Sequence, residues 1–365
     1  MSGYSAPRLV VRDASEAGGS FLKEAQAFIA EFLDDSATVL VHTSGSTGKP
    51  KPFQAEKARM AASARMTCGY LGLTPGMTNL LAMPLAYIAG KMVVVRSIVC
   101  GLALVVVHPS SNPFRTYVDG ERAAGREPEP LDLVAVTPMQ AQGILDDPET
   151  AALFLKSRAV IIGGGAVGEE LLQRLQPAEG AVYSSYGMTE TLSHIALRRL
   201  TGAHPEFGYR PLSGVTLSTS DKGTLVIEAP HVASHPLVTN DIVRFLPDGT
   251  FLVRGRLDNV INSGAIKIQI EEAEAKLAHV IPGRFAISSR PSRTLGEEVV
   301  LVLEGTDEDL ARLDKQAVIG ALGKYEKPRA WIAAPVLPLT QTNKPDRPAI
   351  RAIAAKAPRL PGDLP

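Results

Sequence analysis

Short apolar runs that alternate with helical patterns dominate the first half of this 365-residue chain. Apolar runs of this length predict buried strands, and the stretches with helical spacing predict the connections between them. The predicted strands are Thr38–His42, Leu80–Pro84, Leu102–Val107, Leu131–Val136, Ala159–Ile162 and Ala181–Tyr186, and the predicted helices are Ala55–Leu71, Ile88–Val99, Met139–Leu145 and Gly168–Leu175. Alternation of this kind favours an α/β fold with layers around a largely parallel sheet.

The pattern changes after about residue 205. A β region follows, with predicted strands Leu225–Glu228, Asp241–Leu246 and Phe251–Arg254 and a hairpin turn at 247–249. From Asp258 onward the chain predicts helices over Glu271–Leu277 and Asp307–Leu322 and strands over Phe285–Ser288 and Val299–Leu303. We therefore expect two domains, a large one over 1–257 and a small mobile α+β domain over 258–365.

The composition excludes several classes of protein. Lys plus Arg and Asp plus Glu each number 38, so the chain lacks the net charge typical of binding to nucleic acid or anionic membranes. The only two cysteines, Cys68 and Cys100, argue against a disulfide framework or a structural zinc site. The apolar run 92–107 is short for a membrane span and contains Arg96, so it predicts a buried helix and strand. With no signal-peptide pattern at the start, we expect a cytoplasmic globular protein, frayed over 358–365.

A motif suited to phosphate follows the first predicted strand. The residues from Thr43 to Lys51 read TSGSTGKPK, and they combine four hydroxyl side chains, two glycines and two lysines. Glycine backbone N–H groups can approach an anion, hydroxyls can donate hydrogen bonds, and lysines neutralise charge. The spacing differs from that of a Walker A loop. An ordinary Gly/Ser turn is the alternative for this segment alone.

A second motif, SSYGMTET over 184–191, follows another predicted strand. Tyr186 can stack on a base, Thr189 can bind a phosphate oxygen, and Glu190 can hold Mg²⁺ through its carboxylate. The glycines 163–165 end the preceding strand, where the backbone could approach a flat ligand closely. A glycine triplet is more often a simple loop.

Two further motifs stand in the second half. Asp241, in TND, could accept hydrogen bonds from two ribose hydroxyls, although an Asp that ends a turn is equally compatible with the pattern. The segment 255–264 reads GRLDNVINSG, and the segment 338–344 reads PLTQTNK. Taken alone, Lys344 could simply be a solvated surface lysine.

Together, the four motifs in this order resemble the AMP-forming adenylate enzymes, a family that includes acyl- and aryl-CoA ligases. The resemblance spans about 43–347. It implies an enzyme that uses ATP, Mg²⁺ and a small carboxylic acid to form an acyl-adenylate, which CoA then converts to a thioester.

The resemblance also implies roles for the matching residues. The β- and γ-phosphates of ATP would be held by Thr43, Ser44, Gly45, Ser46, Thr47, Gly48 and Lys49. The adenine side of the nucleotide site would comprise Gly163, Gly164, Gly165, Ser185, Tyr186 and Gly187. Thr189 would contact the α-phosphate, Glu190 the metal, and Asp241 and Arg256 the ribose. Lys344 would bridge the substrate carboxylate and the α-phosphate.

The resemblance further places Asp258 at a hinge and Ser263, Gly264 and Lys267 in a loop that serves the CoA step. Tyr87 stands beside the acyl pocket, where many relatives have His. His194 could face the acyl substrate or could be an ordinary buried or surface histidine.

The chain departs from the family pattern at several positions. Ala265 stands where Gly is usual, and because alanine tolerates positive φ poorly, this change affects the expected pantetheine channel. Ile270 stands where Pro is common. Asn343 replaces the usual Gly before the lysine, a mild change because Asn also visits left-handed conformations. Only 42 residues precede the phosphate motif, whereas typical relatives carry a long N-terminal subdomain.

Abbreviated members are familiar among the o-succinylbenzoate–CoA ligases of menaquinone biosynthesis, and the segment 87–96 is similar to theirs. Two alternatives stay open. One is transfer to a carrier-protein thiol instead of CoA, and the other is a relative that binds nucleotide without catalysis. Whether the protein is a homo-oligomer is also open.

Overall fold

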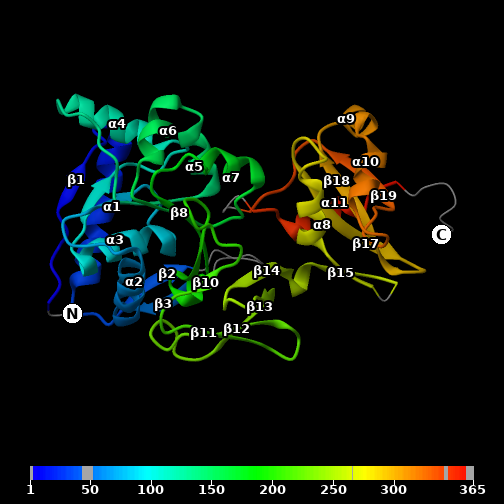
Figure 1. Ribbon diagram of the computed structural model, residues 1–365, viewed down its shortest axis with the longest axis horizontal. Coiled ribbons are helices and arrows are strands. Elements are labelled where there is room, and N and C mark those ends of the chain that lie inside the picture. The colour runs from blue at the N-terminus through cyan, green and yellow to red at the C-terminus, as the bar shows by residue number, and fades with distance from the viewer. Residues whose placement is uncertain (1–2, 43–51, 265, 341–343, 359–365) are drawn as a thin grey trace. The chain divides into compact units, whose positions relative to one another are not determined.

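The computed structural model describes residues 3–42, 52–264, 266–340 and 344–358 (Figure 1). The chain forms two compact units. One comprises Met1–Ser218, Ile227–Leu237 and Phe245–Phe251, and the other comprises Thr219–Val226, Val238–Arg244 and Leu252–Pro365. The division expected between residues 257 and 258 stays a prediction.

An eight-stranded sheet forms the centre of the first unit. Its strand order is β1 (Leu9–Val11), β5 (Ala103–Val106), β4 (Thr78–Leu81), β6 (Leu133–Val136), β7 (Ala159–Ile162), β8 (Ala181–Gly187), β9 (His194–Arg199) and β10 (Arg210–Pro211). The pairs from β1 to β8 are parallel, whereas β9 is antiparallel to both β8 and β10. The predicted α/β class with a largely parallel sheet is confirmed.

Helices cover both faces of this sheet, which is why its central strands are apolar on both sides. The helices are α1 (Glu16–Leu33), α2 (Lys57–Leu71), α3 (Ile88–Cys100), α4 (Pro113–Ala123), α5 (Pro138–Leu145), α6 (Pro148–Leu155) and α7 (Glu169–Leu175). Along β6, Val134 and Val136 pack in the cluster that includes residues of α4 to α7, and Leu133 packs in the opposite cluster with Leu71 of α2.

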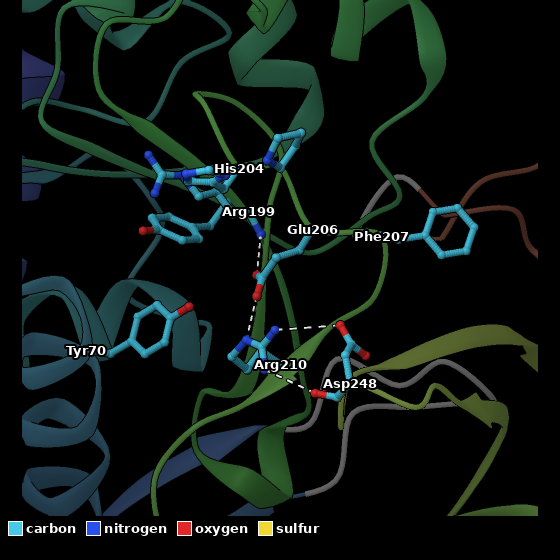
Figure 2. A pocket seen from close by; sticks show the side chains of 9 residues that line it. Tyr70, Arg199, His204, Glu206, Phe207, Arg210 and Asp248 are labelled. Atoms are coloured by element: carbon cyan, nitrogen blue, oxygen red, sulfur yellow. Dashed lines mark hydrogen bonds and ion pairs between the residues drawn. The ribbon is translucent and has the colours of Figure 1, made fainter.

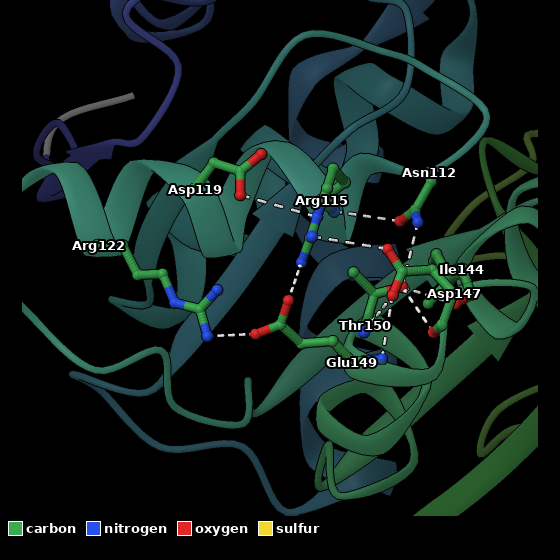
Figure 3. A network of polar contacts seen from close by, with 8 residues as sticks. All are labelled: Asn112, Arg115, Asp119, Arg122, Ile144, Asp147, Glu149 and Thr150. Carbon is green, nitrogen blue, oxygen red and sulfur yellow. Dashed lines mark hydrogen bonds and ion pairs between the residues drawn. The ribbon is translucent and has the colours of Figure 1, made fainter.

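Hydrogen bonds at the starts of the helices fix their first turns. Thr137 forms a capping box with Gln140, so that Pro138 occupies the first turn of α5. Figure 3 shows a polar network between α4 and α6, in which Arg115 Nη2 lies 2.5 Å from Glu149 Oε2 and Arg122 pairs with the same carboxylate. These contacts join two helices that cover one face of the sheet.

Three smaller sheets complete the fold. An antiparallel sheet contains β11 (Thr216–Thr219), β12 (Thr224–Glu228), β13 (Leu237–Phe245) and β14 (Phe251–Arg256) in that order. A C-terminal sheet contains β16 (Ile266–Gln269), β15 (Val260–Ser263), β18 (Gly296–Glu304), β17 (Phe285–Ser292) and β19 (Ala330–Ala334). The helices of this region are α8 (Ile270–Leu277), α9 (Asp307–Arg312), α10 (Lys315–Ala321) and α11 (Arg347–Ala354). The predicted β region and α+β region are both present.

The strand predicted over 38–42 is confirmed, whereas two predicted helices differ from the structure. The strand β2 (Thr38–His42) does not join the parallel sheet but pairs antiparallel with β3 (Pro52–Glu56) as the third small sheet. The helix expected from residue 55 begins at Lys57, because 52–56 pair with β2 instead. The helix expected over 307–322 is two helices, since Asp314 accepts the N–H groups of residues 316 and 317 and starts a new one.

Across the part of the chain that the structure describes, no helix combines the length and apolar content needed to cross a membrane. The apolar run 92–107 is divided between α3 and β5, as predicted, and most of it is buried.

We predict that Phe154→Ala lowers the free energy of unfolding by about 3–5 kcal/mol, because it leaves a cavity in the core. Phe154 is 1% exposed, and its ring centroid lies 5.4 Å from that of Phe114 in an edge-to-face arrangement. Urea unfolding measures the change. Arg122→Ala, which removes an exposed ion pair, is the control and should alter stability far less. Equal losses in the two variants would contradict this account.

Candidate functional site

The candidate site lies where the parallel strands of the first unit end. The carboxyl ends of neighbouring parallel strands meet at one edge of a sheet, and ligands of open α/β sheets bind there. Tyr87 follows β4 and precedes α3, Gly163 follows β7, and Gly187 ends β8. The phosphate motif, from Thr43 to Lys51, lies outside the described residues.

The glycines after β7 permit a close approach between two strand ends. A Cβ on Gly163 would lie 2.6 Å from Ser185 Oγ, and Gly164 has a φ of +82°, so both positions favour glycine. The Ser185 hydroxyl donates to the Ile162 carbonyl at 3.3 Å. The structure thus brings the glycine segment and Ser185 together, while their adenine role stays a prediction.

Tyr186 belongs to an aromatic cluster. Its ring centroid lies 5.9 Å from that of Tyr209 and 5.3 Å from that of Phe251, and its side chain is half-buried. These rings fix the tyrosine at the end of β8, where it can present an aromatic surface to a ligand. Gly187 next to it has no room for a Cβ, which would lie 2.3 Å from the Ser193 carbonyl oxygen.

The residues Thr189–Thr191 form a short 3₁₀ turn between β8 and β9. Thr189 and Thr191 are buried and Glu190 is half-buried. Thr191 Oγ1 lies 3.0 Å from both the backbone N and the carbonyl oxygen of Met188, so it holds the turn closed. Leu192 then adopts a φ of +65°, a conformation that costs a non-glycine residue about 1–3 kcal/mol. The loop that carries Glu190 is therefore strained and must be held by its surroundings.

Arg96 supplies part of that support, and the motif analysis did not assign it a role. This residue of α3 is 3% exposed, and its Nη2 donates to Ser193 Oγ at 2.6 Å. Burial lowers the pKa of the guanidinium. Among the described residues no carboxylate pairs with it, and its Nε is buried without a hydrogen-bond partner. The feature of the sequence that could have indicated this role is the position of Arg96 as a single arginine inside the apolar run 92–107.

His194 is held on both sides of its ring. Its Nε2 lies 2.9 Å from Thr67 Oγ1 and its Nδ1 lies 3.3 Å from Ser193 Oγ. The residue is 7% exposed, and burial, aided by the positive charge of Arg96, holds the pKa of His194 well below 6.5. The imidazole is therefore neutral at pH 7. Its role toward an acyl substrate stays a prediction, and its contacts show a role in holding the loop.

Three charged residues form a group in the second unit. Arg256 Nη1 lies 3.2 Å from Asp241 Oδ1, and Arg256 makes two contacts of 2.9 Å with the Asp258 carboxylate. Desolvation alone would raise the pKa of Asp258, but the hydrogen bonds and charge of Arg256 outweigh it and hold that pKa below its usual range. The structure brings Asp241 and Arg256 together, and their ribose role stays a prediction. Asp258 lies in the short turn Leu257–Asn259 between β14 and β15, and its hinge role also stays a prediction.

The remaining predicted residues of this unit lie in the β15–β16 hairpin and near Thr340. Ser263 and Gly264 stand at the end of the β15–β16 hairpin, and Lys267 pairs with Asn262 in its register. Gly264 has a φ of +56°, and its N–H donates to the Leu295 carbonyl at 2.8 Å. Lys344 is exposed, its carbonyl oxygen accepts from the Thr340 N–H at 2.7 Å, and its own N–H donates to Thr340 Oγ1 at 3.2 Å.

The Glu190 carboxylate is suited to be one ligand of a Mg²⁺ ion whose other ligands come mainly from a nucleotide. In the described ranges no group of three or more His, Cys, Asp or Glu residues could hold a metal by itself. Glu190 also has no hydrogen bond or ion pair with any described residue, so its carboxylate is available. Mg²⁺ is commonly held by one or two carboxylates together with phosphates and water.

Figure 2 shows a polar pocket of about 450 Å³ that is not part of this candidate site. Its lining includes Tyr70, Tyr183, Arg199, His204, Glu206, Arg210 and Asp248. The Glu206 carboxylate accepts from Arg210 Nε at 2.5 Å and from the Arg199 backbone N–H at 3.1 Å. None of the predicted site residues lines the pocket, and several of its charges are paired with one another.

We predict that the stability of the protein falls as the pH drops below about 6.5, partly because of His194. The unfolded histidine binds a proton near that pH, whereas the folded one resists protonation, so acid favours the unfolded chain. Urea unfolding between about pH 7.5 and about pH 5.5 measures the loss. His194→Gln should show a smaller loss over this interval. An unchanged pH dependence in the variant would show that His194 does not contribute.

Comparison with known proteins identifies the family. The sequence profile of the AMP-binding enzymes matches residues 9–233. A probable 2-succinylbenzoate–CoA ligase of Mycobacterium tuberculosis is 30% identical over 349 residues, which cover 90% of this chain and 88% of that protein. A 4-chlorobenzoate–CoA ligase of Arthrobacter is 26% identical, over 89% of this chain and 67% of the relative.

Solved structures agree in fold. An acyl-CoA synthetase (AMP-forming)/AMP-acid ligase II-like protein of Dyadobacter fermentans is 34% identical, covers 90% of this chain and 93% of its own, and has a TM-score of 0.60. The o-succinylbenzoate–CoA synthetase of Bacillus subtilis, in complex with its acyl-adenylate intermediate, has a TM-score of 0.68 at 23% identity, over 86% of this chain and 68% of that one. The profile match and the relative 30% identical over 90% of this sequence show that the chain belongs to the AMP-binding enzyme family.

Proposed function

We propose that this protein is an AMP-forming 2-succinylbenzoate–CoA ligase that acts in the cytoplasm. In the first half-reaction, a carboxylate oxygen of the acid attacks the α-phosphorus of ATP, an acyl–O–P bond forms, and pyrophosphate leaves. In the second, the CoA thiol loses its proton and attacks the acyl carbonyl, and AMP leaves. Both steps balance without a covalent intermediate on the protein.

The observation that carries the proposal is the similarity to 2-succinylbenzoate–CoA ligases over almost the whole chain. Relatives so named from Mycobacterium tuberculosis and Bacillus velezensis match 90% and 91% of this chain. The ends of the parallel strands support it, because the segments after β4, β7 and β8 carry the residues to which this proposal assigns the acid, the nucleotide and the metal.

The first half-reaction concentrates negative charge at the α-phosphorus and on pyrophosphate. We assign Thr189 to the α-phosphate, the hydroxyl and lysine groups of 43–49 to the outer phosphates, and Glu190 to Mg²⁺. When bound, Mg²⁺ would neutralise phosphate charge and orient the leaving pyrophosphate. Arg96 and His194 would act as positioning residues, because their contacts with Ser193 and Thr67 hold the strained loop that follows Glu190.

The second unit would supply the groups that distinguish the two half-reactions. Lys344 would neutralise charge between the carboxylate and the α-phosphate during adenylation. The hairpin with Ser263, Gly264 and Lys267 would then serve the thiol step, with Asp258 as the pivot between the two arrangements. A pivot is plausible in the turn 257–259, since backbone rotation at the boundary between two strands need not disrupt either one.

A substrate panel tests the proposed function. ATP–pyrophosphate exchange and CoA-dependent AMP release are measured with 2-succinylbenzoate, 4-chlorobenzoate, benzoate and hexanoate. We expect kcat/KM for 2-succinylbenzoate to exceed the others by about 100-fold, since a site built for a polar side group rejects acids that lack it. Preference for another acid would overturn the assignment of 2-succinylbenzoate as the substrate. Pyrophosphate exchange that does not depend on any acid would overturn the assignment of the protein as an acid–CoA ligase. If AMP is released with a phosphopantetheinyl carrier protein but not with CoA, the thiol acceptor is the carrier protein and not CoA.

Glu190→Gln should preserve the fold and slow adenylation most at limiting Mg²⁺, because an amide oxygen is a poorer ligand than a carboxylate. Pyrophosphate exchange measured over a range of Mg²⁺ concentrations should show partial recovery at high metal. Glu170→Gln, which alters an exposed carboxylate of α7, is the matched control. A Glu190→Gln enzyme that equals the wild type at limiting Mg²⁺ would refute the metal assignment.

Lys344→Ala should slow adenylation by about 10²–10³-fold, the scale for loss of one preorganised group that stabilises charge. Thioester formation from supplied acyl-adenylate should slow much less, because no pyrophosphate leaves in that step. The exposed Lys327 provides the control variant, Lys327→Ala. If both half-reactions suffer equally in Lys344→Ala, the lysine does not act selectively in the first.

A further inference from the structure

The two cysteines of the chain meet on one side of the first unit. Cys68 lies in the last turn of α2, and Cys100 is the last residue of α3. Both line the same surface hollow, which has a volume of about 510 Å³. None of the residues assigned above to nucleotide, acid, metal or CoA lines this hollow.

The two cysteines are neighbours on adjacent helices. Cys100 Sγ lies 3.8 Å from the carbonyl oxygen of Ala64, which is one helical turn before Cys68. Both side chains are free thiols, and each shifts the pKa of the other. Because Cys100 touches the turn of α2 that precedes Cys68 and both cysteines line one hollow, each thiol has a second cysteine as its neighbour.

The two thiols differ in access. Cys68 is 4% exposed, whereas Cys100 is only partly buried. Cys100 is therefore the side chain that a small solute entering the hollow would reach. Because α3 ends at Cys100 and Gly101 follows with a φ of +67°, Cys100 is not enclosed by a further helical turn.

The surroundings of the pair are positively charged. Arg65 lines the hollow, Arg96 acts on both thiols from α3, and no acidic residue is in the lining. The interaction with Cys68, together with the charges of Arg96 and Arg65, lowers the pKa of Cys100, while the same interaction and burial raise the pKa of Cys68. A partly exposed thiol beside cations is the setting in which cysteines react as thiolates.

We propose that Cys100 and Cys68 form a site of reversible oxidation, at which a hydroperoxide such as hydrogen peroxide converts the two thiols to a disulfide. The Cys100 thiolate attacks a peroxide oxygen, so that an S–O bond forms, the O–O bond breaks and hydroxide leaves. The Cys68 sulfur then attacks the resulting sulfenic acid, an S–S bond forms, and water leaves with the proton of Cys68. The peroxide is reduced to two waters, and the new bond joins α2 to α3.

Peroxide treatment of the intact protein tests the site directly, because no other cysteine is present. We expect the wild type to lose both thiols, to lose two hydrogen atoms in mass without gaining oxygen, and to regain both thiols with dithiothreitol. A peptide map without reductant should contain the Cys68–Cys100 cross-link. These measurements do not involve enzymatic activity, so they stand apart from the proposed function.

Two serine variants separate the roles of the thiols. In Cys68→Ser, Cys100 should form a sulfenic acid that dimedone traps, since no second sulfur is present to displace it. In Cys100→Ser, Cys68 should react with peroxide at least about tenfold more slowly than Cys100 does, because it is buried and protonated. Circular dichroism tests whether each variant is folded. If a variant is not folded, the non-reducing peptide map of the wild-type protein still shows whether the Cys68–Cys100 disulfide forms. Three results would overturn the proposal. Both thiols could survive excess peroxide, Cys100 could gain oxygen without a cross-link, or the disulfide could join two chains.

Discussion

Parallel strands cannot be joined by tight turns, and this constraint governs the first unit. Each of β4, β6, β7 and β8 requires a crossover that returns the chain to the same end of the sheet. The crossovers cover both faces, so the sheet interior is apolar, and polar chemistry can enter only where strands end. The segments after β4, β7 and β8 therefore carry the candidate residues at one edge, although these residues are far apart in the sequence.

Much of this arrangement can be predicted from the sequence. Strands buried on both faces, such as Ala159–Ile162, appear as short continuous apolar runs, and their predicted bounds agree with the structure. Glycines and hydroxyl residues directly after such runs mark the strand ends at which a ligand is expected. The family follows from the order of four motifs, and the profile match over 9–233 bears it out. These features are local, and local patterns are what a single sequence reveals.

Contacts between distant segments could not be predicted in this way. The hydrogen bond between Arg96 and Ser193 joins residues 97 positions apart, and that between Thr67 and His194 joins residues 127 apart. None of the four residues indicates its distant partner when its own segment is considered alone. The same limitation affected β2, because its antiparallel partner β3 also fits the start of a helix.

Gly90, in the first turn of α3, has a consequence for how substrate choice can evolve. A Cβ at this position would lie 2.5 Å from the Pro84 carbonyl oxygen and 2.7 Å from that of Met83, so the helix rests directly on the preceding turn. The backbone around Tyr87 is consequently confined between the two. In the proposed function Tyr87 lies beside the acyl pocket, so a new acid would be accommodated by exchanging that side chain, because moving the helix would disturb the turn beneath it. Selection could thus retune this wall of the pocket one residue at a time, with the backbone that presents the nucleotide-binding segments left in place.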